Sequence, residues 1–180
     1  ILKRYIRDYE ENENINRAVQ VLEHAKREAL ATQDKTTLIG YEGMASNAYF
    51  EVLPVLILNQ KADFPFHGRN RRPPKDAVNA MLSFAYTLIA NDTSAALETV
   101  GLDPYVGFLH TLRPGRTSLA LDMMEELRAY LGDRFVLSLI NKRQITSKDF
   151  LFQGDNGVVM TDKGKKTFIS AWQARKREVI

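Results

Sequence analysis

The chain has 180 residues, of which 44% are hydrophobic, and 25 basic against 22 acidic side chains give it a net charge of +3. This is enough apolar sequence to bury one substantial core, which excludes a disordered tail. The lack of cysteine excludes disulfides and thiolate metal sites and is typical of a reducing compartment. No apolar run reaches the roughly 18 residues that a membrane helix needs, so we predict a soluble protein.

The first third of the sequence predicts helices separated by one polar break. Residues 2–9 look helical, polar residues 10–14 predict a break, and apolar residues recur at helical spacing over residues 15–31. A further helix is predicted over residues 36–58, with Pro54 expected to kink or end it. Because the chain begins inside a charged helix without an initiator methionine, we expect a fragment of a longer protein.

The middle of the sequence predicts a loop and then another helix. Residues 59–74 are rich in proline, glycine and polar side chains, which indicates an irregular loop. Pro74 suits the first position of a helix, and the negative charge of Asp76 in its first turn interacts favourably with the helix dipole. We expect this helix to end near Ala90, with a break at residues 91–94.

After that break the sequence predicts short helices, two turns and a hairpin. A short helix is expected to end at Gly101, and turns are expected at residues 103–104 and 113–117. Helical sequence then runs over residues 118–142, and residues 149–160 predict a small β-hairpin. Thr161 is expected to cap a last helix, whose apolar residues are Phe168, Ile169 and Trp172. The predicted fold is mostly α: one multi-helix domain over residues 1–180 with a hairpin near the C-terminus.

Three acidic residues lie within one turn of the predicted helix over residues 118–142. Asp122, Glu125 and Glu126 stand three and four residues apart, which predicts one acidic face. The opposite, apolar stripe is predicted to contain Ala120, Met123, Leu127 and Leu131. Like charges at this spacing repel by roughly 0.2–0.5 kcal/mol per pair, so a bound cation would explain the cluster. The other interpretation is a solvated acidic face.

Two further residues could bind a metal ion together with this acidic face. His110 follows the apolar residues 106–109, where an imidazole would be partly desolvated and kept in its neutral, ligating form, although a satisfied core histidine is the alternative. Glu42 is flanked by Gly40, Gly43 and small residues that leave room for a ligand. The alternative is that Glu42 is only an acidic first-turn residue that interacts favourably with the helix dipole. Carboxylates with an imidazole suit Mg²⁺ or Mn²⁺.

Basic residues gather in two of the predicted loops. The first set is Arg69, Arg71, Arg72 and Lys75, and the second is Arg113 and Arg116, shortly after His110. Prolines 73 and 74 stiffen the first loop, which lowers the entropy lost when it holds a polyanion. These residues therefore predict contacts with DNA phosphates, although such loops also serve only to keep a helical domain soluble. Lysines and arginines near the C-terminus are interpreted as a solvated face.

Several separate motifs resemble one family, the CRISPR-associated integrase and endonuclease of the spacer-acquisition machinery. They occur in the family's order within residues 2–172 and read GYEG (40–43), RRPPKD (71–76), GFLH (107–110) and RTSLALDMMEELR (116–128). The resemblance implies that this chain is the α-helical catalytic domain, without the family's N-terminal β-rich domain. It also implies a cytoplasmic prokaryotic protein with Glu42, His110 and Glu125 as metal ligands and Asp122 as a supporting residue.

The implied activity is the joining of short foreign DNA to a CRISPR array, with Mg²⁺ or Mn²⁺ as cofactor. A 3′ hydroxyl attacks a phosphodiester of the repeat, and metal-dependent DNA cleavage uses the same chemistry. The family works with a small companion adaptation protein and forms a homodimer largely through the domain that this chain lacks. The resemblance implies no membrane partner.

Two alternative functions remain open on the sequence. One is a helical DNA-binding module without catalytic activity, in which the acidic residues contact a basic partner surface. The other is a metal-dependent phosphohydrolase of small nucleotides, which usually needs a denser set of ligands. A nucleoside triphosphatase is disfavoured because the sequence has no glycine-rich phosphate-binding loop.

Overall fold

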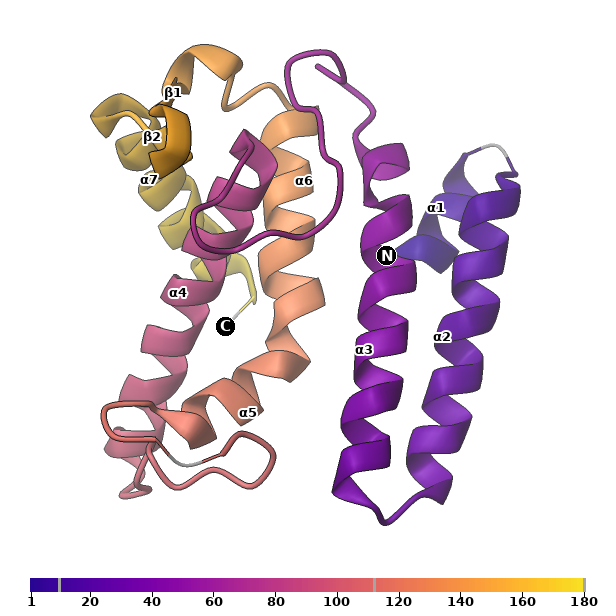
Figure 1. Ribbon diagram of the computed structural model, residues 1–180. Coiled ribbons are helices and arrows are strands. Elements are labelled where there is room, and N and C mark those ends of the chain that lie inside the picture. Colours follow the sequence, from indigo (N-terminus) through magenta and orange to yellow (C-terminus); the bar gives the residue numbers. More distant parts are fainter. Residues whose placement is uncertain (10, 112, 180) are drawn as a thin grey trace.

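The N-terminal part of the protein is a helical hairpin with one short helix packed against it. The computed structural model describes residues 1–9, 11–111 and 113–179, and its first helices are α1 (Leu2–Asp8), α2 (Glu13–Ala31) and α3 (Lys35–Val52). Figure 1 shows α2 and α3 side by side and antiparallel. The Asn12 and Asp34 side chains accept the N–H groups of Ile15 and Thr37 and so cap α2 and α3. The predicted helices in this region are confirmed.

The chain leaves α3 through a 3₁₀ turn and a long loop before it enters α4. Pro54 lies in the 3₁₀ turn, Leu53–Leu56, and therefore ends the α-helix as predicted. The loop runs to α4 (Ala77–Thr99), whose N-cap is Asp76, and the Asp76 carboxylate accepts the Asn79 N–H at 2.7 Å. The prediction that Pro74 begins this helix is therefore wrong, because the Asp76 side chain supplies the cap instead.

The helix α4 is also longer than predicted, because it passes through the polar residues 91–94 without a break. Asn91 and Asp92 are exposed, Thr93 and Ser94 are half-buried, and Asp92 forms an ion pair with Lys176 of α7 at 2.9 Å. The helix ends where the sequence predicted, since Gly101 has a φ of +80° and the Leu102 N–H donates to the Leu97 carbonyl. Polar composition alone therefore did not indicate a break.

The second half of the chain forms one long interrupted helix, a hairpin and a last helix. The long helix consists of α5 (Ser118–Leu127), a π-helical turn (Arg128–Asp133) and α6 (Arg134–Asn141). The antiparallel strands β1 (Phe150–Phe152) and β2 (Val158–Met160) pair with Phe150 opposite Met160, and α7 spans Asp162–Val179. Thr161 accepts the Gly164 N–H and caps α7 as predicted. The mostly α fold with a small hairpin is confirmed.

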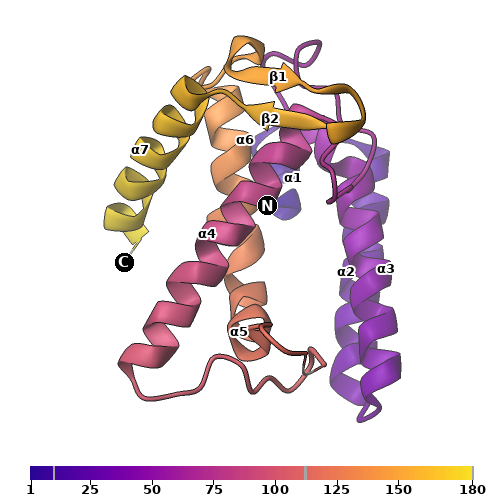
Figure 2. The same ribbon diagram turned by 60° about the vertical axis from the view of Figure 1, so that its left-hand side comes forward.

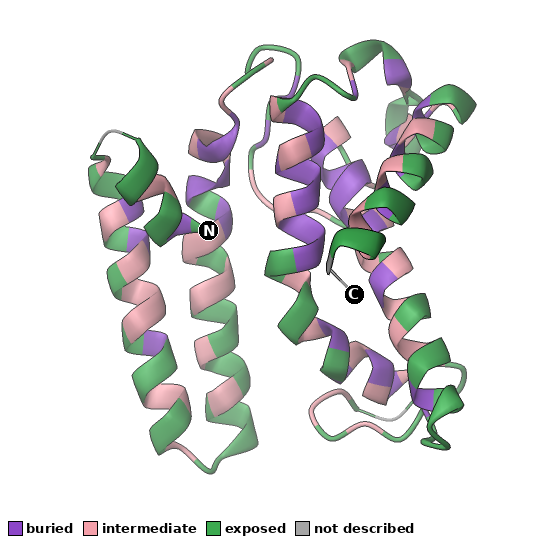
Figure 3. Cartoon of the chain, turned by 180° about the vertical axis from the view of Figure 1, so that it is seen from behind, coloured by how far each residue is buried: buried purple, intermediate pink, exposed green. Residues whose placement is uncertain are grey.

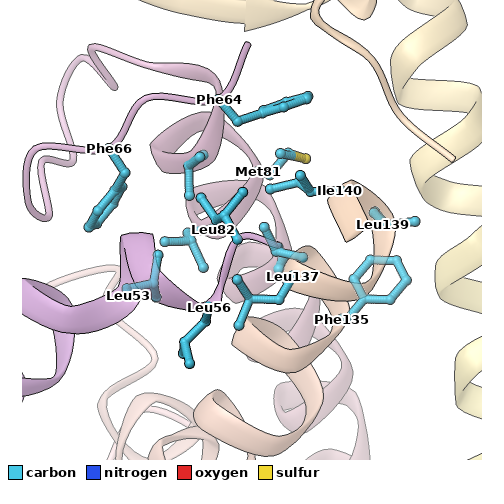
Figure 4. Packing of buried hydrophobic residues seen from close by; sticks show 14 of the residues in the cluster. Leu53, Leu56, Phe64, Phe66, Met81, Leu82, Phe135, Leu137, Leu139 and Ile140 are labelled. Carbon is cyan, nitrogen blue, oxygen red and sulfur yellow. The ribbon is translucent and has the colours of Figure 1, made fainter. Parts of the chain in front are cut away.

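The core lies where α4 and α6 meet the 3₁₀ turn and α7. Figure 3 shows buried residues gathered along α4 and α6, whereas the α2–α3 pair is mostly intermediate or exposed. In Figure 4, Met81 and Leu82 of α4 lie near Leu53, Leu56 and other apolar side chains, among them Phe64, Leu137 and Ile140. No described helix is both long and apolar enough to cross a membrane.

The predicted apolar stripe of α5 is only partly correct. Ala120 and Leu131 are buried, but Met123 and Leu127 are 43% and 41% exposed, and Met124 takes the buried position instead. The reason is that Asp122 is itself buried, which turns α5 about its axis relative to the expected orientation. In α7, likewise, Phe168 and Trp172 are buried but Ile169 is 42% exposed.

We expect Phe168→Ala to lower the free energy of unfolding by about 3–5 kcal/mol, because it leaves a cavity among aromatic rings. The Phe168 ring lies 5.1 Å from Phe84 and 5.0 Å from Phe135 between ring centres. Urea denaturation followed by circular dichroism measures the loss. The matched control is Ile169→Ala on the next, exposed position of the same helix, and similar losses in both variants would contradict this account of the core.

Candidate active site

The buried carboxylate of Asp122 holds the loop that carries His110. Its oxygens accept the backbone N–H groups of Phe108 at 2.6 Å, Leu109 at 2.9 Å and His110 at 2.9 Å. The His110 Nδ1 lies 2.6 Å from the same carboxylate. An ionised carboxylate only accepts hydrogen bonds, so Nδ1 carries the proton and Nε2 is left as the nitrogen that can bind a metal.

Two further contacts bring this loop against the start of α5. A β-carbon at Gly107 would lie 2.7 Å from backbone and side-chain atoms of Ser118, so only glycine permits this approach. The Pro104 carbonyl accepts the N–H groups of Leu119 and Ala120, which are free at the beginning of the helix. The loop and α5 therefore form one unit that fixes the His110 backbone.

Asp122 is charged because its hydrogen bonds outweigh its burial. Burial alone raises the pKa of a carboxyl group, but the N–H groups of Leu109, His110 and Phe108 and the His110 ring lower the pKa of Asp122 below its ordinary value. The negative charge is thus present at neutral pH and stabilises the protonated Nδ1 edge of His110.

The three carboxylates of α5 do not form the predicted acidic face. Asp122 is 5% exposed and points inward, Glu126 is exposed, and Glu125 accepts two hydrogen bonds from Arg128 at 2.6 and 2.8 Å. Asp122 and Glu125 therefore have partners within the protein and Glu126 is solvated, so a bound cation is not needed to explain their spacing. The predicted apolar surroundings of His110 are also wrong in part, because Val106 and Phe108 are 59% and 60% exposed.

His110 and Glu125 line the same pocket, which has a volume of about 680 Å³. Six arginines share its wall: Arg69, Arg71, Arg72, Arg113, Arg116 and Arg128. Tyr86 and Thr87 of α4, which lies between the two arginine loops in the sequence, also line the pocket. Both predicted basic loops and two predicted metal ligands are therefore brought together in space, although they come from distant parts of the chain.

The arginines of the first loop differ in exposure and in hydrogen bonding. The Arg69 guanidinium donates to Asn79 at 2.8 Å and to Ser83 at 3.0 Å, and burial lowers the pKa of Arg69. Arg71 and Arg72 are exposed at the pocket. Lys75 is exposed too but does not line the pocket, and its backbone N–H donates to the Asn70 side chain. Arg69 thus supports the loop, and Arg71 and Arg72 are available to a ligand.

The β-hairpin supports this loop from the other side. The Val158 N–H donates to the Pro74 carbonyl at 2.8 Å, and Gly157, with a φ of +82°, packs directly against Pro73 and Pro74. Figure 2 shows the hairpin across the same end of the molecule as the loop before α4. The hairpin was predicted, but its contact with the arginine loop was not.

Glu42 stands apart from the other predicted metal ligands. It is exposed on α3 and does not line the pocket of His110 and Glu125. A β-carbon at Gly40 or Gly43 would meet no atom within 4 Å, so the helix surface beside Glu42 is open, as the flanking glycines predicted. Over residues 1–9, 11–111 and 113–179, no group of three or more histidine, aspartate and glutamate side chains is arranged to hold a metal ion.

Three residues of the pocket region were not predicted from the sequence. Arg128 pairs with Glu125, and its guanidinium carbon lies 4.7 Å from the centre of the Tyr86 ring. The Tyr86 hydroxyl donates to Asp133, which is 3% exposed, and burial raises the pKa of Asp133. The spacing of Glu125 and Arg128 is a usual helical ion pair, but nothing in the sequence shows that Tyr86 and Asp133 lie behind them.

The comparisons with known proteins identify the family of this chain. The family model of the CRISPR associated protein Cas1 matches residues 1–174, and the chain therefore belongs to the Cas1 family. A CRISPR-associated endonuclease Cas1 of Chlorobaculum tepidum is 49% identical over 99% of this chain and 53% of its own length. Another, of Rhodospirillum rubrum, is 51% identical over 89% of this chain and 47% of its own length. The chain spans about half the length of these relatives.

Solved structures share the fold. A Cas1 protein from Thermotoga maritima superposes with a TM-score of 0.80 at 31% identity, over 88% of this chain and 50% of that one. A casposase bound to its integration product has a TM-score of 0.74 at 25% identity, over 88% and 47%. A chain of a Cas6-RT-Cas1–Cas2 complex has a TM-score of 0.79 at 27% identity, over 88% and 18%.

We expect Asp122→Asn to lower the stability of the folded protein by about 2 kcal/mol at neutral pH, because an amide cannot accept all four hydrogen bonds. The folded pKa of Asp122 is lowered, so this stabilisation is present above the ordinary carboxyl pKa and is lost as the pH falls through the folded value. Thermal unfolding of both proteins at neutral and acidic pH measures the difference. Glu126→Gln, an exposed neighbour, is the control, and a gap that persists unchanged in acid would contradict the assignment.

Proposed function

We propose that this chain carries the catalytic centre of a divalent-metal-dependent DNA endonuclease and integrase that inserts foreign DNA into a CRISPR array. The observation that supports it most is the pocket itself, where His110 and Glu125 lie among six arginines. Imidazole nitrogen and carboxylate oxygen are ligands for Mg²⁺ or Mn²⁺, and guanidinium groups bind phosphates. Membership of the Cas1 family supports the same chemistry.

Two of the three expected metal ligands, His110 and Glu125, are placed where they could bind one divalent cation. His110 offers Nε2 because Asp122 holds Nδ1, and Glu125 offers its carboxylate. Glu42, the third expected ligand, lies on the open face of α3. Glu42, His110 and Glu125 would hold the ion, and Asp122 would orient His110. When bound, the ion would polarise the scissile phosphodiester and orient its attacker.

The proposed reaction exchanges one phosphodiester for another without an external energy source. The 3′ oxygen of the incoming strand forms a bond to phosphorus, the bond to the leaving strand breaks, and that strand leaves with its own hydroxyl after the proton is transferred. Arg71, Arg72, Arg113 and Arg116 would neutralise the phosphates on either side. These contacts are to charge alone, so they position the strands without reading their sequence.

The proposed partners follow from the solved relatives. One neighbour is bound to an integration product, which supports DNA as the substrate, and another comes from a complex that contains Cas2, which supports a small companion adaptation protein. A homodimer of the full-length protein belongs to the same proposal. The chain's own contribution would be the pocket and the two basic loops.

One observation favours a second candidate function, a helical DNA-binding module without catalysis. Glu42 does not line the pocket, and the described residues contain no complete metal-binding group. In that case the arginines would hold DNA, while Glu125 would only balance Arg128. The two functions differ in whether a divalent ion is required.

We expect Glu42→Ala, His110→Ala and Glu125→Ala each to reduce manganese-dependent DNA cleavage and strand transfer by about a hundredfold or more, because each removes a proposed metal ligand. The measurement uses the full-length protein and labelled DNA with and without Mn²⁺. Glu126→Ala is the matched control, since it removes an exposed carboxylate one position away. Full activity in all three variants would sink the metal centre, and cleavage of free nucleotides but not DNA would favour a phosphohydrolase.

We expect the double variant Arg71→Ala and Arg72→Ala to weaken DNA binding and to reduce the slope of log affinity against log salt by about one to two units. For each phosphate contact that is lost, about one counterion fewer is released when DNA binds. Fluorescence anisotropy over a range of salt concentrations measures the slope. The control removes Lys163 and Lys166, which are exposed on α7 and do not line the pocket. An equal change of slope in both double variants would rule out a special role for the arginine loop.

A further inference from the structure

The Glu125 carboxylate already has a cationic partner. Both of its oxygens lie within hydrogen-bonding distance of the same nitrogen of Arg128, at 2.8 and 2.6 Å. The Arg128 side chain is 13% exposed and that of Glu125 is 36% exposed. A guanidinium in this position uses part of the carboxylate's lone pairs and places a positive charge beside it, so Arg128 and a cation compete for one carboxylate.

Arg128 is held in place from behind by buried groups. Its guanidinium carbon lies 4.7 Å from the centre of the Tyr86 ring, and that of Arg69 lies 5.3 Å from the same ring. The Tyr86 hydroxyl donates to the Asp133 carboxylate, which is buried between the helices. Tyr86 and Asp133 thus fix the ring on which Arg128 rests, and this ring gives Arg128 a second contact at the pocket besides Glu125.

The π-helical turn is what places these groups together. It spans Arg128–Asp133, so both charged ends of the turn lie beside α4. A β-carbon at Gly132 would come within 3.1 Å of the Tyr86 ring and 3.2 Å of Ile89, which shows how closely the backbone of the turn packs against that ring. Such turns insert one residue into a helix and often occur at functional sites.

We propose that Arg128 is a displaceable counter-ion: it neutralises Glu125 until a divalent cation takes the carboxylate, and its freed guanidinium then binds a phosphate oxygen of the DNA. This inference rests on the proposed function. The six arginines of the pocket repel a cation that arrives alone, and an entering phosphodiester reduces that repulsion. Metal and DNA therefore bind cooperatively, and each raises the affinity for the other by the same factor.

The test is the affinity for Mn²⁺ alone, measured without DNA at low salt by calorimetry or by the paramagnetic resonance signal of free Mn²⁺. We expect Arg128→Met to bind Mn²⁺ about fivefold more tightly than the wild type, which is the effect of removing one partly exposed ion pair. Arg128→Lys, which keeps the charge, should stay near the wild type. A gain in affinity distinguishes this role from a purely structural one, because damage to the fold would weaken binding.

The chain offers a matched control in α7. Arg175 donates to Glu178, three residues later, and lies 5.6 Å from the centre of the Tyr130 ring, so it repeats the same pairing outside the pocket. Arg175→Met should leave the Mn²⁺ affinity unchanged. Arg128→Gln serves in place of the Met variant if the latter does not fold, as judged by circular dichroism.

The outcomes separate this inference from the function on which it rests. If Glu125→Gln abolishes Mn²⁺ binding but Arg128→Met binds Mn²⁺ no more tightly than the wild type, the counter-ion role is wrong and the metal centre stands. If neither the wild type nor Arg128→Met shows Mn²⁺ binding that depends on Glu125, the counter-ion role and the proposed metal centre both fail. A similar gain in Arg175→Met would also overturn the inference, because it would show a general effect of charge.

Discussion

The buried Asp122 carboxylate is the interaction on which the geometry of the site depends. It gathers three consecutive backbone N–H groups and one imidazole nitrogen around a single negative charge. A buried charge is costly unless it is fully hydrogen-bonded, and here the loop supplies every bond. The loop conformation, the tautomer of His110 and the rotation of α5 that buries Asp122 are therefore consequences of one choice of residue.

Much of the fold was accessible from the sequence because its signals are local. Helical spacing of apolar residues, Pro54 and Thr161 each act within a few residues, and the corresponding elements form as predicted. The predicted break within α4 is wrong because that prediction, too, used only local signals. Polar residues 91–94 resemble a break in isolation, but Lys176 from the last helix gives Asp92 a partner that no local rule includes.

The site was less accessible, because spacing shows which residues share a helix face but not which face is buried. Asp122, Glu125 and Glu126 are equivalent by spacing, yet one is buried, one is paired and one is solvated. The resemblance to a family separated Glu125 from its neighbours, which the residues alone did not. Tyr86 and Asp133 gave no signal at all, because a tyrosine in an apolar helix and an aspartate near a glycine are common in any helical protein.

The contact between the hairpin and the arginine loop has a consequence for how the protein folds. The loop precedes α4, but the backbone that supports it at Pro74 belongs to β2, near the opposite end of the chain. Contacts between distant parts of a sequence form late, since the intervening segment must first be ordered. The helices can assemble as the chain emerges during synthesis, whereas the basic loop reaches its final shape only after the hairpin has been made.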